Sequence, residues 1–155
     1  MNNTIKIKKY SDVIEEYKAA GTITPGMLLQ LTSADKVQAH ANAGQNQLPM
    51  FALEDELQGR GIDTDYTADN QVQVWVPYRG DMVYALLNDG ETVVIGDYLE
   101  SAGNGKLRKH VPIVDSASDV ETIYPNAIVG QAVEAVDMSD SSAADPTGRI
   151  RVRII

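Results

Sequence analysis

The sequence QVQVWVPYRGDMVYALL, Gln71–Leu87, decides the fold class because it contains two strand patterns in succession. Between Gln71 and Val76 every second residue is a valine, which is the period of a strand with one buried face. Pro77 ends this run, since proline has no N–H group to donate to a neighbouring strand. The second run, Met82–Leu87, continues through a turn into Glu91–Gly96, so we predict a β-hairpin there.

Similar short runs occur on both sides of this stretch. Ser33–Gly44 alternates polar and apolar residues and predicts a strand. Asn126–Asp137 is apolar on both faces, so both should be covered, and Gly130 indicates a bulge or a close backbone approach. Gly148–Ile155 alternates arginine with isoleucine or valine and predicts a closing strand with one basic face. Many short strands between turns are typical of a β-sandwich or β-barrel.

One segment near the start has a helical pattern. Ser11 can cap a helix, Gly21 can end it, and apolar residues recur over Val13–Tyr17. We therefore expect an N-terminal arm with a possible short helix over residues 1–21 and a single β-rich domain over residues 22–155. The predicted fold class is mainly β, a small barrel-like domain with at most one or two short helices.

The stretch GDYLESAGNGKLRKH, Gly96–His110, predicts a second hairpin with an Asn-Gly turn at its tip. A phosphate-binding loop is not expected, because no helix follows and the GxxxxGK[ST] spacing is missing. Lys106, Arg108 and His110 alternate along the second strand and should project from one face. Such charges can prevent an edge strand from pairing with a strand of another molecule, or they can contact an acidic partner.

The composition of the chain excludes several classes of function. The chain has 155 residues, a formal net charge of −9 and no cysteine. The negative charge argues against binding to nucleic acid or to membrane surfaces, because both need a basic face. The missing cysteines exclude disulfides, thiolate metal sites and cysteine nucleophiles. No secretory signal pattern and no apolar run long enough to cross a bilayer are present.

Residues for catalysis are scarce. His40 and His110 are the two histidines, and no serine lies in a GxSxG elbow. Two distant histidines without cysteine also argue against a zinc site. We therefore predict a protein that is not an enzyme and has no cofactor or metal. An enzyme hypothesis stays open, and it requires a pocket in which one of these histidines meets a carboxylate.

Two binding hypotheses also stay open. The acidic stretch with Asp63, Asp65 and Asp69 begins like a calcium-binding EF-hand loop, but it lacks the required glycine and closing glutamate. A solvated acidic loop is the simpler interpretation. Exposed aromatic residues could stack on sugars or peptides, which would make the chain a non-catalytic glycan- or peptide-binding β module; the candidates are Trp75, Tyr78 and Tyr84.

Several motifs resemble one family when they are taken in order. They are FALEDELQGRGID, VVIGDYLESAGNGKL, AIVGQAVEAVD and the final RIRVRII. Together with the strands between them, from Thr22 to Ile155, they resemble the head decoration (capsid cement) proteins of tailed bacteriophages. None of these motifs is a catalytic signature.

The resemblance implies a β-tulip domain that assembles as a homotrimer over three-fold positions of the mature capsid and stabilises it. The implied partner is the major capsid protein of a tailed phage. The implied location is the outer capsid surface of the virion, after synthesis in the bacterial cytoplasm. For this role the basic segments are the candidate contacts with the capsid or between subunits.

The N-terminal segment MNNTIKIKKY alternates isoleucine and lysine, so we expect an arm that adds a strand to a sheet edge of the capsid. The hairpin and the last strand supply the remaining candidates. The complete set is Ile5, Lys6, Ile7, Lys8, Lys9, Tyr10, Lys106, Arg108, His110, Arg149, Arg151 and Arg153.

Overall fold

The computed structural model describes residues 3–8, 13–112, 124–140 and 148–155. This part of the chain consists of strands, turns and one short 3-10 helix, so the prediction of a mainly β protein is confirmed. The strands form three sheets, and none of them closes into a barrel among the described residues. The elements are β1 (Lys6–Lys8), β2 (Val13–Ala19), β3 (Leu29–Leu31), β4 (Lys36–Ala39), β5 (Phe51–Ala52), η1 (Glu56–Gln58), β6 (Gln71–Val76), β7 (Met82–Leu86), β8 (Thr92–Val93), β9 (Tyr98–Ser101), β10 (Leu107–Lys109), β11 (Ile128–Ala132), β12 (Val136–Asp137) and β13 (Arg149–Ile154).

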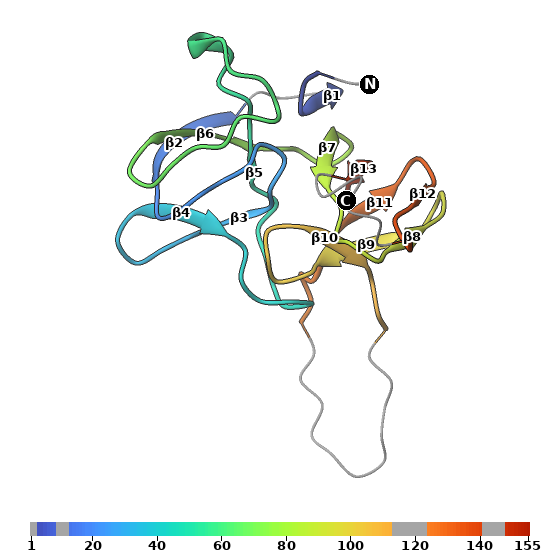
Figure 1. Ribbon diagram of the computed structural model, residues 1–155. Helices are drawn as coiled ribbons and strands as arrows, with labels where there is room; N and C mark the ends of the chain where they lie inside the picture. The colour runs from blue at the N-terminus through green and yellow to red at the C-terminus, as the bar shows by residue number, and fades with distance from the viewer. Residues whose placement is uncertain (1–2, 9–12, 113–123, 141–147) are drawn as a thin grey trace.

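The largest sheet has six strands in the order β1-β7-β13-β11-β9-β10, and every neighbouring pair is antiparallel. It lies on one side of the molecule, and a five-stranded sheet lies on the other (Figure 1). The predicted closing strand is present as β13, which pairs with β7 on one side and β11 on the other. The first strand pattern is present as β6, with the predicted bounds Gln71–Val76.

The five-stranded sheet has the order β3-β4-β2-β6-β5. The strand predicted within Ser33–Gly44 is confirmed as β4, which pairs with β3 and, over two residues, with β2 in parallel. A single bridge between Leu28 and Phe51 also brings β5 beside the chain that enters β3. The small remaining sheet consists of β8 and β12.

Two clusters of buried side chains hold these sheets together. The larger one joins the inner face of the six-stranded sheet to Trp75 and Phe51 of the other sheet, and the smaller one lies within the five-stranded sheet. Strand β6 contributes to both, because Val74 packs in the smaller cluster while the next residue, Trp75, packs in the larger one. Successive side chains of a strand point to opposite faces, so β6 has one core on each of its faces. Val74 and Trp75 are accordingly both fully buried.

The helix predicted near the start is wrong. Val13–Ala19 forms β2, which pairs with β6 from Val13 to Lys18, while the proposed cap Ser11 lies outside the described residues. Local helical propensity is a weak determinant, and six backbone pairings with a neighbouring strand override it. The segment 13–19 is therefore part of the five-stranded sheet.

The predicted hairpin between Met82–Leu87 and Glu91–Gly96 is also wrong. The turn at Asp89–Gly90 is present, but β7 pairs with β1 and β13, and β8 pairs with β12. A turn signal is local, whereas the neighbours of a strand depend on segments that are distant in sequence.

Gly130 behaves as predicted, and both of the expected explanations hold. The register of β11 against β9 shifts between Ile128 and Gly130, as in a β-bulge. A side chain at position 130 would also lie only 2.5 Å from the carbonyl oxygen of Arg153. The position therefore has no room for a Cβ atom.

Candidate functional site

The hairpin of Gly96–His110 is confirmed as β9 and β10, with Ser101 opposite Leu107 and Glu100 opposite Arg108. Its tip contains Gly103 and Gly105, whose φ angles of 87° and 76° suit glycine. The carbonyl oxygen of Gly105 accepts a hydrogen bond of 2.8 Å from the N–H of Leu28. The tip is therefore attached to the chain that enters β3, and it does not extend freely into solvent.

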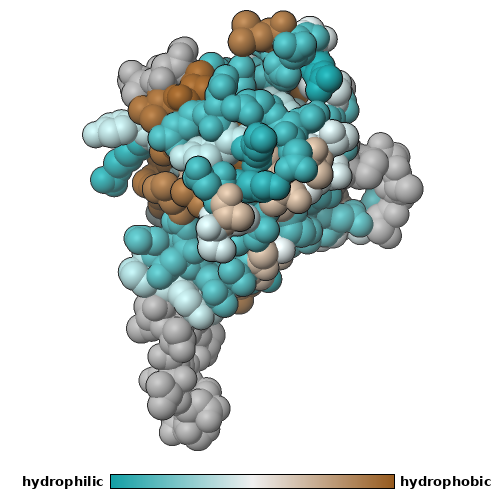
Figure 2. Space-filling view, turned by 90° about the vertical axis from the view of Figure 1, so that its left-hand side faces the viewer, coloured by the Kyte–Doolittle hydropathy of each residue, from teal (hydrophilic) through white to brown (hydrophobic). Residues whose placement is uncertain are grey.

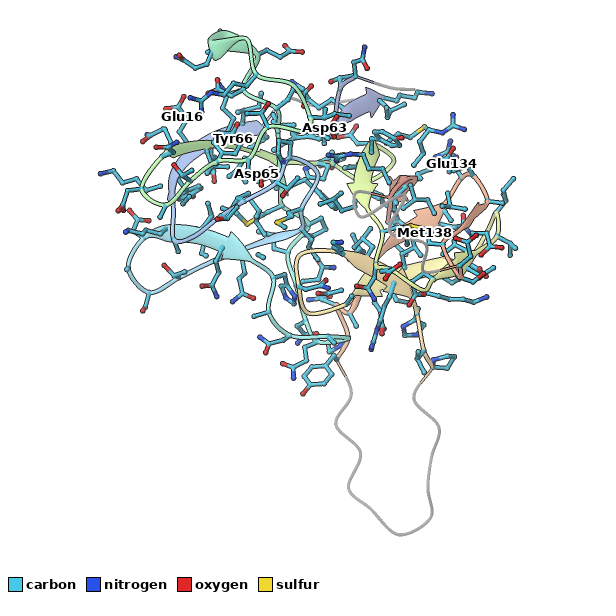
Figure 3. All side chains as sticks on the ribbon, viewed as in Figure 1. Glu16, Asp63, Asp65, Tyr66, Glu134 and Met138 are labelled. Atoms are coloured by element: carbon cyan, nitrogen blue, oxygen red, sulfur yellow. The ribbon has the colours of Figure 1, made fainter. Side chains whose placement is uncertain are left out.

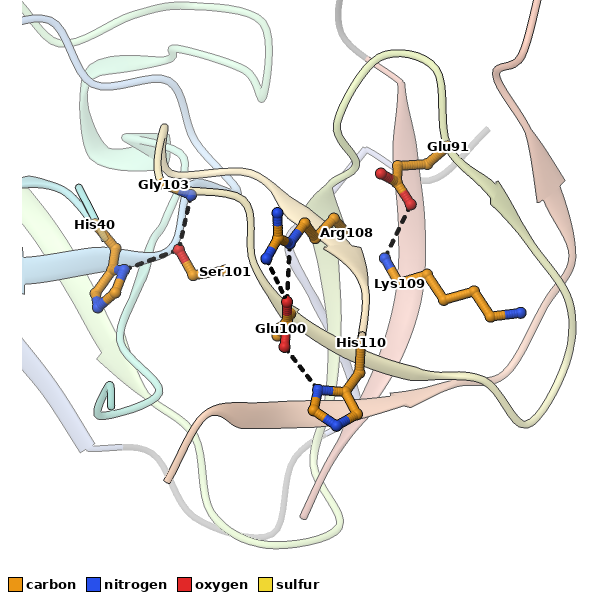
Figure 4. Close-up of polar contacts among 8 residues, drawn as sticks. All are labelled: His40, Glu91, Glu100, Ser101, Gly103, Arg108, Lys109 and His110. Carbon is orange, nitrogen blue, oxygen red and sulfur yellow. Dashed lines mark hydrogen bonds and ion pairs between the residues drawn. The ribbon is translucent and has the colours of Figure 1, made fainter. Parts of the chain in front are cut away.

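Two of the predicted contact residues bind a carboxylate of their own hairpin (Figure 4). Arg108 Nε and Nη2 lie 2.8 and 2.7 Å from Glu100 Oε1, and His110 Nδ1 lies 2.6 Å from Glu100 Oε2. The Glu100 side chain is only 3% exposed. Both of its oxygens are therefore occupied, and Arg108 and His110 direct these polar groups into the domain.

Sequence reasoning missed Glu100, because the predicted two-residue Asn-Gly turn would place Ser101 opposite Arg108. In the structure the N–H of Ala102 donates a hydrogen bond to the carbonyl oxygen of Lys106, so the loop has three residues and Glu100 lies opposite Arg108. Residues directly opposite in an antiparallel pair share a face, so a glutamate there meets the arginine. The third residue of this basic alternation, Lys106, also has an interaction partner.

The cluster lies at the edge of a cavity of about 310 Å³. The cavity is lined by this cluster and by residues from other parts of the chain. The lining residues are Ala43, Gly44, Glu100, Arg108, His110, Val111, Pro112, Tyr124 and Ala127. A histidine beside a carboxylate at a pocket is the feature that the enzyme hypothesis required, so the structure does contain this arrangement.

His40 has a different environment. Its ring Nδ1 lies 2.8 Å from Ser101 Oγ, and Nε2 lies 3.3 Å from the carbonyl oxygen of Asn46. His40 is 3% exposed and Ser101 is completely buried, so neither can reach a substrate in solution. Burial is the main cause that lowers the pKa of His40, which favours the neutral ring.

The three arginines of β13 occupy three different environments. Arg149 is buried, and its Nη1 and Nη2 donate hydrogen bonds of 2.7 Å to the carbonyl oxygens of Pro25 and Ile62. Arg151 is half-exposed and its Nε lies 2.8 Å from Glu134. Arg153 is exposed, and it makes a weak polar contact with Met82. The predicted basic face therefore does not include Arg149 as an exposed residue, because its guanidinium group is buried against the segments that contain Pro25 and Ile62.

The N-terminal segment does not form a free arm over residues 3–8. Strand β1 pairs with β7, and Ile5 is completely buried in the larger core. The backbone N–H of Ile5 and the hydroxyl group of Thr4 both donate hydrogen bonds to Glu54. Ile5 is therefore a core residue, and Ile7 is half-buried beside it. Lys9 and Tyr10, also predicted contacts, lie outside the described residues.

The sheet register aligns residues from five strands in one row across the outer face of the six-stranded sheet. Each member of the row is directly opposite the next, so their side chains share a face. Most of them are exposed to solvent. The row is Lys8, Met82, Arg153, Gln131 and Tyr98.

The calcium hypothesis gains no support. No group of three or more metal-binding side chains occurs within the described ranges. Asp69 pairs with Lys36 at 2.6 Å, which lowers the pKa of Asp69 through a hydrogen bond. Asp63 is 3.7 Å from Arg149 and lies nearer to the six-stranded sheet than Asp65 does (Figure 3). These carboxylates therefore do not converge on one point.

The aromatic platform is also absent from the described surface. Trp75 is fully buried and Tyr84 packs partly buried against the larger core. Tyr78, in contrast, is 66% exposed. The three aromatic residues therefore cannot form one flat stacking surface.

No helix among the described residues is long and apolar enough to cross a membrane. No protein-family model matches the chain, and no curated protein sequence matches it. Among solved structures, the chain resembles the N base of head fiber gp8.5 of bacteriophage phi29 at 14% identity and a TM-score of 0.57. The similarity covers 94% of this chain and 95% of that one. This chain therefore shares its fold, over nearly its whole length, with the N base of the phi29 head fiber.

Proposed function

We propose that this chain is a structural protein of a tailed bacteriophage that attaches to the outer surface of the head. The observation that carries the proposal is the likeness to the N base of the phi29 head fiber, which extends over 94% of this chain. The order of sequence motifs supports the same role, because it resembles head decoration proteins. The location that follows is the surface of the virion, and the partner is the major capsid protein.

The proposal includes the absence of catalysis. Both oxygens of Glu100 contact side chains of the same hairpin, and Arg108 at 2.7 Å competes for the carboxylate that a catalytic His110 would need. The other histidine, His40, is buried against Ser101. These polar groups satisfy one another, as buried polar groups do in a stable core. Their arrangement supports a structural role.

Attachment alone can stabilise a capsid. A protein that binds the assembled, expanded shell and not the free subunits shifts the equilibrium toward the shell, by RT ln(1 + [L]/Kd) for each site. A homotrimer, which we propose from the resemblance, would also gain a high effective concentration for its second and third contacts. Modest affinity at each site then gives long-lived attachment.

Binding to heads tests the proposal directly. The purified protein is mixed with empty expanded heads of the phage that encodes it, and binding is measured by co-sedimentation and imaged by electron microscopy. We expect saturable binding at a fixed lattice position and a higher temperature of head disruption. Unexpanded proheads and heads of an unrelated phage are the controls. Equal binding to all three particles, or none to any, would reject the proposed role.

A second measurement addresses catalysis. The protein and its H110Q variant are incubated with ester, glycoside and phosphoester substrates. We expect no turnover by either protein. Turnover that the His110→Gln substitution abolishes would instead support the enzyme hypothesis.

A further inference from the structure

A groove with both apolar and amide side chains in its lining lies beside the end of β13, on the outer face of the six-stranded sheet. Its volume is about 450 Å³. Leu48 and Ile155, which line it, are 59% and 47% exposed, so two large apolar side chains face solvent there. The C-terminal groove, as we name it, is formed by Gln47, Leu48, Pro49, Pro125, Asn126, Ile128 and Ile155.

Two arginines lie next to this groove. Arg153 comes two residues before Ile155 along the same extended chain, so both side chains project from the same face of the sheet. The N–H of Gly80 donates a hydrogen bond of 2.8 Å to the carbonyl oxygen of Ile154, which places Arg79 at the same end of β13. Arg79 is exposed and makes no hydrogen bond or ion pair with the described part of the chain.

The turn that carries Arg79 is held in one conformation. Asp81 is completely buried, and its carboxylate accepts a hydrogen bond of 2.7 Å from the N–H of Tyr78. The N–H of Ile154 donates to the carbonyl oxygen of Asp81 at 3.0 Å. A fixed turn lowers the entropy cost of binding through the residues that it presents, Tyr78 and Arg79. Tyr78 is 66% exposed, and an exposed tyrosine is a common anchor in interfaces.

Exposed basic residues lie around the end of β13, although the net charge of the whole chain is −9. They are Arg79, Arg153 and Lys8, which is opposite Met82 in the row. Side chains ending in nitrogen gather around β1 and β7 (Figure 3). Figure 2 shows another face of the molecule, which is mostly hydrophilic and has hydrophobic patches toward its upper left.

We propose that the C-terminal groove and its two arginines bind an acidic segment of the capsid protein. An apolar side chain of that segment enters the groove, and neighbouring carboxylates bind Arg79 and Arg153, whose guanidinium groups suit carboxylates. The identity of the partner rests on the proposed function, whereas the surface and the chemistry rest on the groove and its charge. A polyphosphate backbone fits less well, since it would be repelled by the remaining surface of a strongly acidic chain.

Paired substitutions test the surface. Arg153→Glu and Leu48→Glu change the proposed surface, while Arg60→Glu and Leu57→Glu make the same changes at exposed positions on or just after η1. We expect each of the first two to weaken binding to empty expanded heads at least about 10-fold, which corresponds to the loss of one charged or apolar anchor. The two η1 variants should bind like the unmodified protein. Circular dichroism and thermal unfolding check that all four variants are folded.

Cross-linking identifies the occupant. The chain has no cysteine, so Leu48→Cys accepts a single photo-cross-linker. After irradiation on decorated heads, mass spectrometry should find an acidic peptide of the capsid protein attached at position 48. A cross-link to a second copy of this chain would overturn the proposed occupant, as would a cross-link to a basic capsid segment.

The outcomes separate the two proposals. If the unmodified protein binds heads and R153E and L48E bind equally well, this surface is not the docking site, although the proposed function survives. If the unmodified protein binds no head, the proposed function fails. In that case binding of R153E and unmodified protein to a glutamate-rich peptide with one leucine, compared by fluorescence anisotropy, still tests the surface, and equal or absent binding would overturn it.

Discussion

Arg149 donates a hydrogen bond of 2.7 Å from its Nη2 atom to the carbonyl oxygen of Ile62. The bond joins β13 of the six-stranded sheet to the loop between η1 and β6. The Nη1 atom of the same side chain donates to Pro25, before β3. One planar guanidinium group therefore connects the last strand to two connecting segments, one before β3 and one before β6. Its Cζ atom lies 5.9 Å from the centre of the Tyr84 ring.

Replacing this arginine should be costly. We expect Arg149→Met to lower the free energy of unfolding by about 3 kcal/mol, because two buried carbonyl oxygens lose their donors. Arg149→Lys should recover little, since one ammonium group cannot reproduce the planar fork. Urea unfolding followed by tryptophan fluorescence measures the change. Arg153→Met at the exposed end of β13 is the control, and an equal effect of both substitutions would contradict this role.

Glu100 should matter more for stability than Glu134. Glu100→Gln leaves Arg108 and His110 beside a neutral group in a largely buried site, so we expect a loss of about 3 kcal/mol. Glu134→Gln removes a half-exposed partner of Arg151 and should cost less than about 1 kcal/mol. Denaturant unfolding at neutral pH compares the two variants. A loss at Glu134 as large as the loss at Glu100 would show that burial does not set these contributions.

His40 should make stability depend on pH. Its pKa in the folded state lies below the ordinary value of 6.5, chiefly because the ring is buried, so the unfolded chain binds more protons. The contribution of His40 is thus complete above pH 6.5, and it is lost as the pH falls below that value toward the lowered pKa. We expect the free energy of unfolding to decrease as the pH is lowered from about 7 through 6.5.

The H40Q variant serves as the comparison for this pH effect. It should be less stable at neutral pH, because Ser101 loses its ring partner, but its stability should change less as the pH is lowered over the same range. Parallel pH profiles for His40→Gln and the unmodified protein would assign the dependence to another group.

Gly130 should not tolerate a side chain. A methyl group there would lie 2.5 Å from the carbonyl oxygen of Arg153 and 2.6 Å from Val152 Cγ1. We expect Gly130→Ala to destabilise the protein by about 2 kcal/mol or more, as overpacking does. Gly61→Ala is the control, because no atom lies within 4 Å of the added group. Thermal unfolding distinguishes the two, and equal midpoints would argue against the close approach.

The N-terminal segment should contribute to folding before it contributes to docking. Ile5 is fully buried, so Ile5→Ala should lower the free energy of unfolding by about 2–4 kcal/mol through loss of burial and a residual cavity. Lys8→Ala, on the exposed side of β1, should have little effect on unfolding. Unchanged stability of I5A would restore the hypothesis of a free arm. Deletion of residues 1–8 would therefore not test docking alone.

Elements whose pattern is local could be predicted from the amino-acid sequence. The strand Gln71–Val76, the existence of the second hairpin and the bulge or close approach at Gly130 all follow from the geometry of one or two neighbouring strands. The absence of cysteine and the net charge of −9 likewise limited the kinds of site that could be expected. Both are properties of the chain that folding does not change. The resemblance to capsid decoration proteins came from motif order alone.

Tertiary structure decided which strands became neighbours and which charges remained exposed. Segment 13–19 became a strand because β6 offered six backbone partners, and β7 paired with β1 and β13, which are distant in sequence. The three equally spaced arginines of β13 have different environments, because Arg149 is buried against the segments of Pro25 and Ile62 whereas Arg153 faces solvent. Alternation fixes the face of a strand, but burial depends on what packs against that face.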